Sequence, residues 1–205
     1  MFIKKINYIN LKSSFLILLI AVSQHLLAQK QSVLNVSSHK LENGLTIFLN
    51  EDPTATKMFG AVMVKAGAVN ESEDATGMAH YLEHLLFKGT TKLGTSNYYE
   101  EKPLLDSISY LYEQLALELD RDKQFKIQKQ INELAVKSAK YGLPNEFDKL
   151  LKSIGGTNIN AFTSYDMTFY HNSFPTHEIE KWLDLYATRF ENPVFRSFQS
   201  EPEVV

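Results

Sequence analysis

The sequence predicts a mixed fold of the α/β (α+β) class, because two kinds of periodicity share one chain. Short β-rich runs bounded by turn residues occur at 33–50, 58–65 and 157–171. Runs with apolar residues at three- and four-residue steps occupy 97–142 and 177–192. Hydrophobic residues make up 44% and charged residues 22%, which is ordinary for a globular protein.

The first 28 residues are predicted to be a signal peptide and are excluded from the fold. A lysine-containing start precedes an apolar core at 14–22, which is too short to span a membrane comfortably. Cleavage is expected after Ala28, although Leu26 meets the small-residue rule poorly, and an uncleaved N-terminal anchor is the alternative. We therefore expect an exported protein, either periplasmic or secreted, with no other membrane association.

The β-rich segments are predicted to form hairpins. Asn43-Gly44 is expected to supply the positive φ angles of a tight turn between two strands at 33–50, and Asp52-Pro53 ends the second strand. A third strand is expected from about Met58 to Lys65. Two more strands, 157–164 and 167–171, are expected to join at Tyr165-Asp166.

The helical segments are predicted to include a long hairpin at 97–142 with a break at 120–122. Its apolar stripe, which includes Leu119 and Phe125, is interpreted as core packing and receives no chemical role. Asn145 is expected to cap a short helix that ends at Ser153. A further helix is expected from His177 to about Asn192.

A helix near 77–89 carries the residues with the clearest chemical meaning. His80 and His84 are four residues apart, so on a helix both imidazoles can reach one metal ion. Glu83 flanks the same face as a base for a metal-bound water, and the spacing H-x-x-E-H is the inverted zinc-peptidase signature. The alternative is an amphipathic helix with two incidental histidines. The apolar character of the surrounding run disfavours it, because unpaired polar groups are costly in a buried helix.

Composition excludes several other classes of site. The chain has no cysteine, so disulfides, thiolate zinc sites, a cysteine nucleophile and a lipid-modified cysteine are all excluded. A metal must then use histidine and carboxylate ligands. The net charge of −3 gives no reason to expect nucleic acid as a partner.

The chain resembles the N-terminal domain of the pitrilysin/insulinase family of zinc metallopeptidases. The matching segments are Leu41–Leu45, Gly67–Gly89, Asn160–Ser164 with Asp166, Thr168 and Tyr170, and Asn192–Phe195. The resemblance assigns 33–205 to such a peptidase domain, incomplete at its C-terminus and carrying a helical insertion at about 102–150. It implies a mostly antiparallel sheet with helices packed on one face, plus the inserted helical hairpin.

The resemblance also implies roles for individual residues. His80 and His84 would hold Zn²⁺, and Glu83 would activate water. The strand containing Asn160, Ala161 and Phe162 would offer its edge to an extended peptide. For Asn160, a structural role in a turn is the alternative.

The third zinc ligand is where the sequence departs from the family pattern. Glu201 matches a glutamate that supports catalysis, and the ligand would fall seven residues later, past Val205. Glu203 is the nearest substitute, but it is expected on the wrong face of its helix. Because the chain ends one turn into this helix, we interpret it as a fragment.

The predicted function is therefore a zinc metalloendopeptidase acting on peptides or small unfolded proteins, with this fragment inactive alone. A second related domain or subunit is expected to close the chamber over the substrate. One alternative is a non-catalytic peptide-binding or partner subunit of a two-component peptidase. Another is a small exported helical protein without metal.

Overall fold

The structure is a computed structural model that describes residues 36–198. The predicted signal peptide, Glu201 and Glu203 lie outside this range. The chain divides into two compact units, residues 1–54 and 55–205, and each is considered by itself. Within 36–198, no helix is both long and apolar enough to cross a membrane.

The first unit contains the predicted hairpin. Strands β1 (Val36–Lys40) and β2 (Thr46–Asn50) pair antiparallel, with Lys40 opposite Thr46. The expected Asn-Gly geometry is only half right, because Gly44 has φ +91° and Asn43 is not in the positive-φ region. The Asn43 side chain instead accepts a hydrogen bond from the Leu45 amide at 3.1 Å. The turn is therefore set by one glycine and one side-chain acceptor, not by two left-handed residues.

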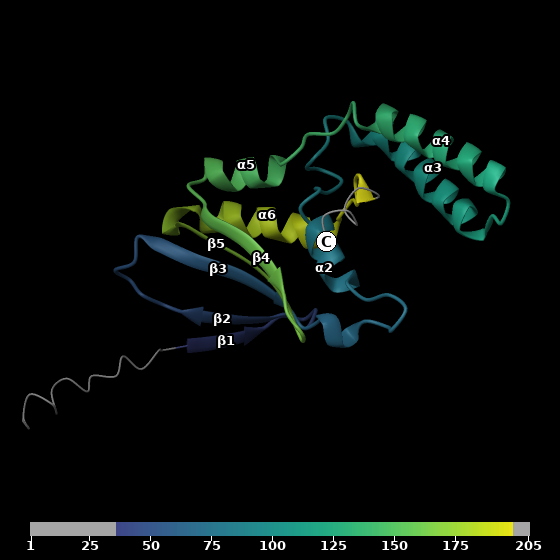
Figure 1. Ribbon diagram of the computed structural model, residues 1–205. Helices are drawn as coiled ribbons and strands as arrows, with labels where there is room; N and C mark the ends of the chain where they lie inside the picture. Colours follow the sequence, from purple (N-terminus) through teal and green to yellow (C-terminus); the bar gives the residue numbers. More distant parts are fainter. Residues whose placement is uncertain (1–35, 199–205) are drawn as a thin grey trace, which may run out of the picture. The chain divides into compact units, whose positions relative to one another are not determined.

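The second unit is built on a three-stranded antiparallel sheet in the order β3-β5-β4 (Figure 1). Its strands are β3 (Lys57–Val64), β4 (Thr157–Thr163) and β5 (Thr168–Pro175). The hairpin predicted at Tyr165-Asp166 is confirmed, with Thr163 opposite Thr168. Strand β5 continues four residues beyond the predicted end at His171, because alternate side chains as far as Phe174 stay buried.

Helices cover one face of this sheet, as predicted. They include α5 (Glu146–Ser153) and α6 (Ile179–Glu191), with the short 3₁₀ helix η2 (Thr176–Glu178) leading into α6. The core joins Leu86 to apolar residues from both helices and the inner sheet face: Phe147, Leu151, Tyr170, Phe174, Trp182 and Tyr186. Trp182 packs so closely on Gly60 that a Cβ there would lie 2.5 Å from the indole. The outer face keeps Phe59, Met63 and Phe162 exposed.

A buried asparagine anchors the aromatic part of the core. Asn172 is fully buried on β5, and its Oδ1 accepts hydrogen bonds from Trp182 Nε1 at 2.8 Å and from the Tyr186 hydroxyl at 3.0 Å. A buried amide is tolerated when it is hydrogen-bonded in this way. The two bonds fix α6 against the middle strand.

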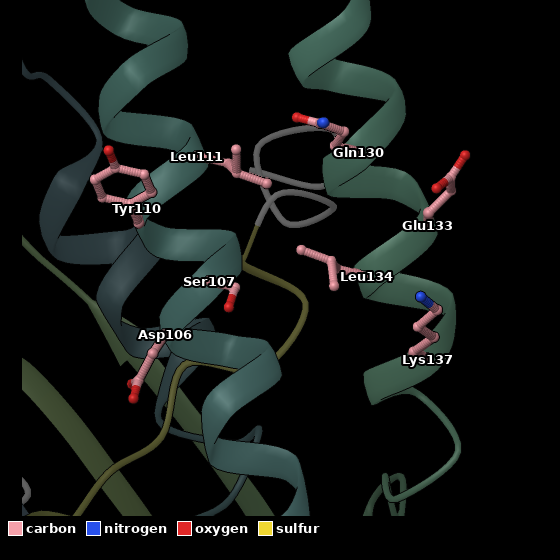
Figure 2. Close-up of a pocket in the computed structure, with 8 residues that line it drawn as sticks. All are labelled: Asp106, Ser107, Tyr110, Leu111, Gln130, Glu133, Leu134 and Lys137. Atoms are coloured by element: carbon pink, nitrogen blue, oxygen red, sulfur yellow. The ribbon is translucent and has the colours of Figure 1, made fainter.

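The predicted helical hairpin is formed by α3 (Tyr98–Leu117) and α4 (Arg121–Ser138), which lie side by side (Figure 1). Ile108 and Ile131 are buried in it. Figure 2 shows Leu111 and Leu134 pointing toward each other across a groove of about 580 Å³ between the helices. The stripe prediction fails at the tip, where Leu119 is 93% exposed and Phe125 is 74% exposed.

The N-termini of α4 and α5 are capped in different ways. Asp120 caps α4 by accepting hydrogen bonds from the amides of Asp122 and Lys123. Asn145 occupies the predicted position before α5, but with φ 59° its side chain makes no capping hydrogen bond. Its backbone carbonyl accepts from the Lys149 amide and so begins the helix.

Candidate active site

The helix that carries the two histidines is α2 (Met78–Leu85), and a carboxylate fixes its start. Glu71 accepts hydrogen bonds from the amides of Gly77 at 2.8 Å and Ala79 at 2.7 Å. These amides have no partner within the helix, and a negative charge there also favours the helix dipole. The Glu71 carboxylate therefore stabilises the start of α2.

The end of α2 comes earlier than predicted. The regular helix stops at Leu85, and tighter turns carry the chain to Lys88 before Gly89. Gly89 has φ +110°, and a Cβ there would lie 2.4 Å from the Leu93 carbonyl oxygen. The glycine is required at this point because both the backbone angle and the close approach exclude a side chain.

The structure brings the two histidine side chains together. The Nε2 atoms of His80 and His84 lie 3.2 Å apart, and the ring planes are nearly perpendicular at 82°. Two nitrogens bound tetrahedrally to one zinc ion at ~2.05 Å would be separated by about 3.3 Å. The observed spacing therefore suits a shared ion, although an imidazole–imidazole hydrogen bond has a similar length.

Glu83 lies between these histidines in sequence but points into the interior, where it is only 6% exposed. The Thr163 hydroxyl donates to its Oε2 at 2.7 Å. A buried carboxylate needs such a donor, because desolvation without a partner is costly. Thr163 lies at the end of β4, so the predicted base is tied to the sheet.

A pocket of about 470 Å³ opens beside His80. It is lined by Ala68, Glu71, Gly77, His80, Thr163, Ser164 and Tyr165. The walls come from the segment before α2, from α2 itself and from the β4–β5 turn. A substrate placed in this pocket would lie next to one predicted ligand and next to the residue that holds the base.

The predicted peptide-binding residues lie on β4, which pairs with β5 alone in the described part of the chain. Asn160 and Phe162 project from one face and are exposed, whereas Ala161 packs against the core. Asn160 is within the strand and opposite His171, so it is not a turn residue. The positive φ in this segment falls on Asn158, at 53°.

Two buried arginines near the end of α2 were not given a role from the sequence. Arg189, on α6, donates from Nε to the Leu86 carbonyl at 3.0 Å. Its guanidinium carbon lies 4.0 Å from the Phe87 ring centroid, and the other rings around it are those of Phe147, Tyr170 and Tyr186. Burial lowers the pKa of Arg189 to about 10, which leaves it charged at neutral pH.

The second arginine, Arg196, is held mainly by a carboxylate, and the Tyr98 ring centroid lies 6.0 Å from its guanidinium carbon. Its guanidinium contacts both oxygens of Glu101 at 2.9–3.0 Å and also donates to the carbonyls of Thr90 and Leu93. Because Glu101 is in the first turn of α3, this ion pair joins the helical hairpin to the loop that follows α2. The loop is thereby held from two sides.

Residues 36–198 contain no cluster of three or more histidine, cysteine or acidic side chains that could hold a metal ion. Of the predicted ligands, His80 and His84 are adjacent, and the position predicted for the third one is outside the described residues. Sequence patterns could have flagged two of the residues that were missed. Thr163 is polar at an inward-facing position of β4, and Arg189 is charged on the apolar stripe of Trp182 and Tyr186.

Comparison with known families decides the class. The family model described as Insulinase (Peptidase family M16) matches residues 46–103 and 115–204. The chain belongs to this peptidase family. It is 23% identical to insulin-degrading enzyme of Bos taurus over 183 residues, which cover 89% of this chain and 13% of that protein. It is 24% identical to a zinc protease of Rickettsia felis over 161 residues, which cover 78% of this chain and 27% of that protein.

A solved structure shares the fold of this chain. The first half of the periplasmic protease PqqL from Escherichia coli is similar in structure, with a TM-score of 0.53 and 18% identity. The match covers 82% of this chain and 28% of that one. The chain spans about an eighth of the length of the insulin-degrading enzyme and about a quarter of the length of the Rickettsia felis protein.

Proposed function

We propose that these residues form the N-terminal part of a zinc-dependent metalloendopeptidase that hydrolyses peptides or small unfolded proteins. The observation that carries the proposal is the 3.2 Å approach of His80 Nε2 and His84 Nε2 on the helix that also holds Glu83. Membership of the M16 peptidase family supports it.

The donor set fits zinc. Two imidazole nitrogens are good ligands for this ion, and a chain without cysteine has no competing thiolate. A bound zinc ion would polarise the scissile carbonyl and lower the pKa of a water molecule. His80 and His84 would hold the ion, and we expect the third ligand past Val205, with Glu201 supporting catalysis.

Glu83 is proposed as the general base and acid. Its carboxylate would take a proton from the attacking water and deliver it to the leaving amine. One oxygen is already engaged by Thr163, so the other is the candidate for this proton transfer. A fixed carboxylate loses less entropy on reaching the productive arrangement than a freely rotating one would.

The edge of β4 that is unpaired within residues 36–198 is proposed to bind the substrate backbone by strand addition. A peptide along this edge would place alternate side chains near Asn160 and Phe162. The Phe162 ring lies 5.3 Å from that of Phe169 and 6.4 Å from that of His171, centroid to centroid. An apolar peptide side chain could pack on this aromatic surface.

Activity is proposed to need more than these residues. A second related domain or subunit would close the chamber, in line with the similarity to one half of PqqL. The intact trio of His80, Glu83 and His84 disfavours a purely non-catalytic subunit. We also propose export, on the basis of the basic and apolar pattern at 1–28.

The test is a substitution of Glu83→Gln in the full natural gene product that contains these residues. We expect peptide hydrolysis to fall about 10²- to 10⁴-fold while bound zinc, measured by mass spectrometry, stays at the wild-type level. Glu73→Gln, a change at an exposed acidic residue before α2, is the matched control and should leave both unchanged. Full activity in the Glu83 variant would remove this residue from the mechanism.

A further inference from the structure

Two neighbouring threonine hydroxyls bind different groups: Thr163 donates to the Glu83 carboxylate, and Thr168 donates to the backbone at Ala66. Thr168 Oγ1 donates to the Ala66 carbonyl at 2.9 Å, and the two hydroxyl oxygens lie 3.4 Å apart. Thr163 Oγ1 then lies 2.7 Å from Glu83 Oε2. Thr168 is buried and Thr163 is half-buried, so water competes little for these groups.

The direction of the hydrogen bonds follows from the two ends. A carbonyl oxygen can only accept, so the Thr168 proton is used on Ala66. An ionised carboxylate can also only accept, so the Thr163 proton is used on Glu83. Both hydroxyl protons are then used elsewhere, and neither is left for the 3.4 Å contact between the two hydroxyl oxygens. The bond to Glu83 is therefore a charge-assisted one with a fixed donor.

The backbone around Thr163 is held firmly. The amides of Ala68 and Val69 donate to the carbonyls of Ser164 and Tyr165 at 3.1 and 2.7 Å. A Cβ on Gly67 would lie 2.4 Å from the Ser164 oxygen, so the two segments are in direct contact. A one-residue slip of β4 would turn Thr163 to the outer face. The docking of this turn thus fixes which side chain reaches Glu83.

We propose that Thr163 is a positioning residue for the proteolytic reaction. Its hydroxyl holds Glu83 Oε2 and leaves the other oxygen of the carboxylate to exchange a proton with the water. Because Thr163 is on the same strand as Asn160 and Phe162, it also fixes the base relative to a peptide on the β4 edge. This proposal rests on the proposed function of Glu83 and adds a residue that acts through it.

The kinetic test uses Thr163→Val and Thr163→Ser in the full natural gene product. Valine keeps the shape and removes the donor, so we expect kcat to fall about 10- to 100-fold, as for other groups that orient catalytic side chains. KM should stay within about twofold, because the bond does not touch the substrate. Serine restores the hydroxyl and should return kcat to within about threefold of wild type. A Thr163→Val variant with wild-type kcat would overturn the proposal.

Thr168→Val is the matched control. It removes a threonine hydroxyl from the same cluster but leaves the donor to Glu83 in place. We expect a lower melting temperature with kcat close to wild type. An equal loss of kcat in both valine variants would show that general damage to the turn, not the bond to Glu83, explains the effect, and this would also overturn the proposal.

A second test does not depend on activity. In the metal-free full-length protein, Thr163→Val should lower Tm in the wild-type background because it leaves a buried carboxylate oxygen without its donor. In a Glu83→Ala background the same change should have little effect on Tm. Additive shifts would refute the Thr163–Glu83 coupling. If the Tm shifts of Thr163→Val and Glu83→Ala are non-additive but the wild-type protein hydrolyses no peptide, the Thr163–Glu83 coupling stands and the peptidase function is rejected.

Discussion

Arg189 and Arg196 are seven residues apart, and both donate to backbone carbonyls that follow α2, yet their charges are compensated differently. Arg196 has a carboxylate partner in Glu101. Arg189 is surrounded by aromatic rings, and its Nη2 has no hydrogen-bond partner among residues 36–198. In the Arg196–Glu101 pair, loss of one member leaves the other as a buried charge without a partner. Arg189 is a cation held mainly by aromatic rings, with an electrostatic attraction to the buried Glu83 carboxylate in addition.

The largest effect is expected from Arg196→Met. The substitution leaves Glu101, which is 1% exposed, as a buried charge without its partner. We expect a loss of roughly 3–5 kcal/mol in the free energy of unfolding, measured by urea denaturation. The double variant Glu101→Met/Arg196→Met removes both charges and should recover most of that loss.

A matched control lies one residue along α3. Lys102 and Asp106 form an ion pair at 2.6 Å, but both side chains are more than half exposed. Lys102→Ala should therefore unfold at the same urea concentration as the wild-type protein. A double methionine variant as unstable as Arg196→Met would show that packing, not charge pairing, dominates at this site.

A smaller loss is expected at Arg189, and it should depend on volume. Arg189→Ala opens a cavity among four rings and should cost about 2–4 kcal/mol. Arg189→Met fills the same space without a charge and should cost about 1–2 kcal/mol, from the lost bond to Leu86 and the lost contacts of the cation with the rings. The measurement is again urea unfolding. If Arg189→Met were as damaging as Arg196→Met, the contrast between the two arginines would be wrong.

The smallest effect concerns alkaline pH and the rings around Arg189. Burial raises the pKa of Tyr186 to about 12. An unfolded tyrosine ionises from near pH 10, so this phenol stabilises the fold fully below that pH, and the contribution is lost as the pH rises toward 12. Arg189 acts in the opposite direction, since its pKa is lowered by burial.

Tyr186→Phe removes the tyrosine contribution. It should lower Tm slightly at pH 7, because the hydrogen bond to Asn172 is lost, and should make the fall in Tm between pH 9 and pH 11 shallower. Thermal unfolding followed by circular dichroism would measure both. A steeper alkaline fall in the variant would contradict the assignment.

Much of the fold follows from the sequence. Hydrophobic periodicity located the strands, the helical hairpin and the helix with His80 and His84. It failed at Leu119 and Phe125, because no other described element covers the apolar side chains at the hairpin tip. The side-chain cap predicted from the residue type of Asn145 was also wrong. A capping hydrogen bond depends on a backbone angle that residue type alone does not fix.

The site was predictable where its residues are close in sequence. His80, Glu83 and His84 lie on one helix of eight residues, so spacing sufficed to predict that the two histidines lie together. The support of Glu83 was not predictable, because Thr163 is 80 residues away and meets it only through the docking of β4. The same holds for Arg196, whose partner Glu101 is 95 residues distant.

The hydrogen bonds from Arg196 to the loop after α2 also determine when, during synthesis of the chain, this loop can be fixed. The Lys88 carbonyl is bound by a side chain 108 residues later in the chain. At roughly 5–20 residues per second, a ribosome needs about 5 to 20 seconds to add that length. The helix with both histidines is therefore synthesised well before Arg196, the residue that holds the loop after it. The site can reach its final form only after α3, α4, β4, β5 and α6 have been synthesised.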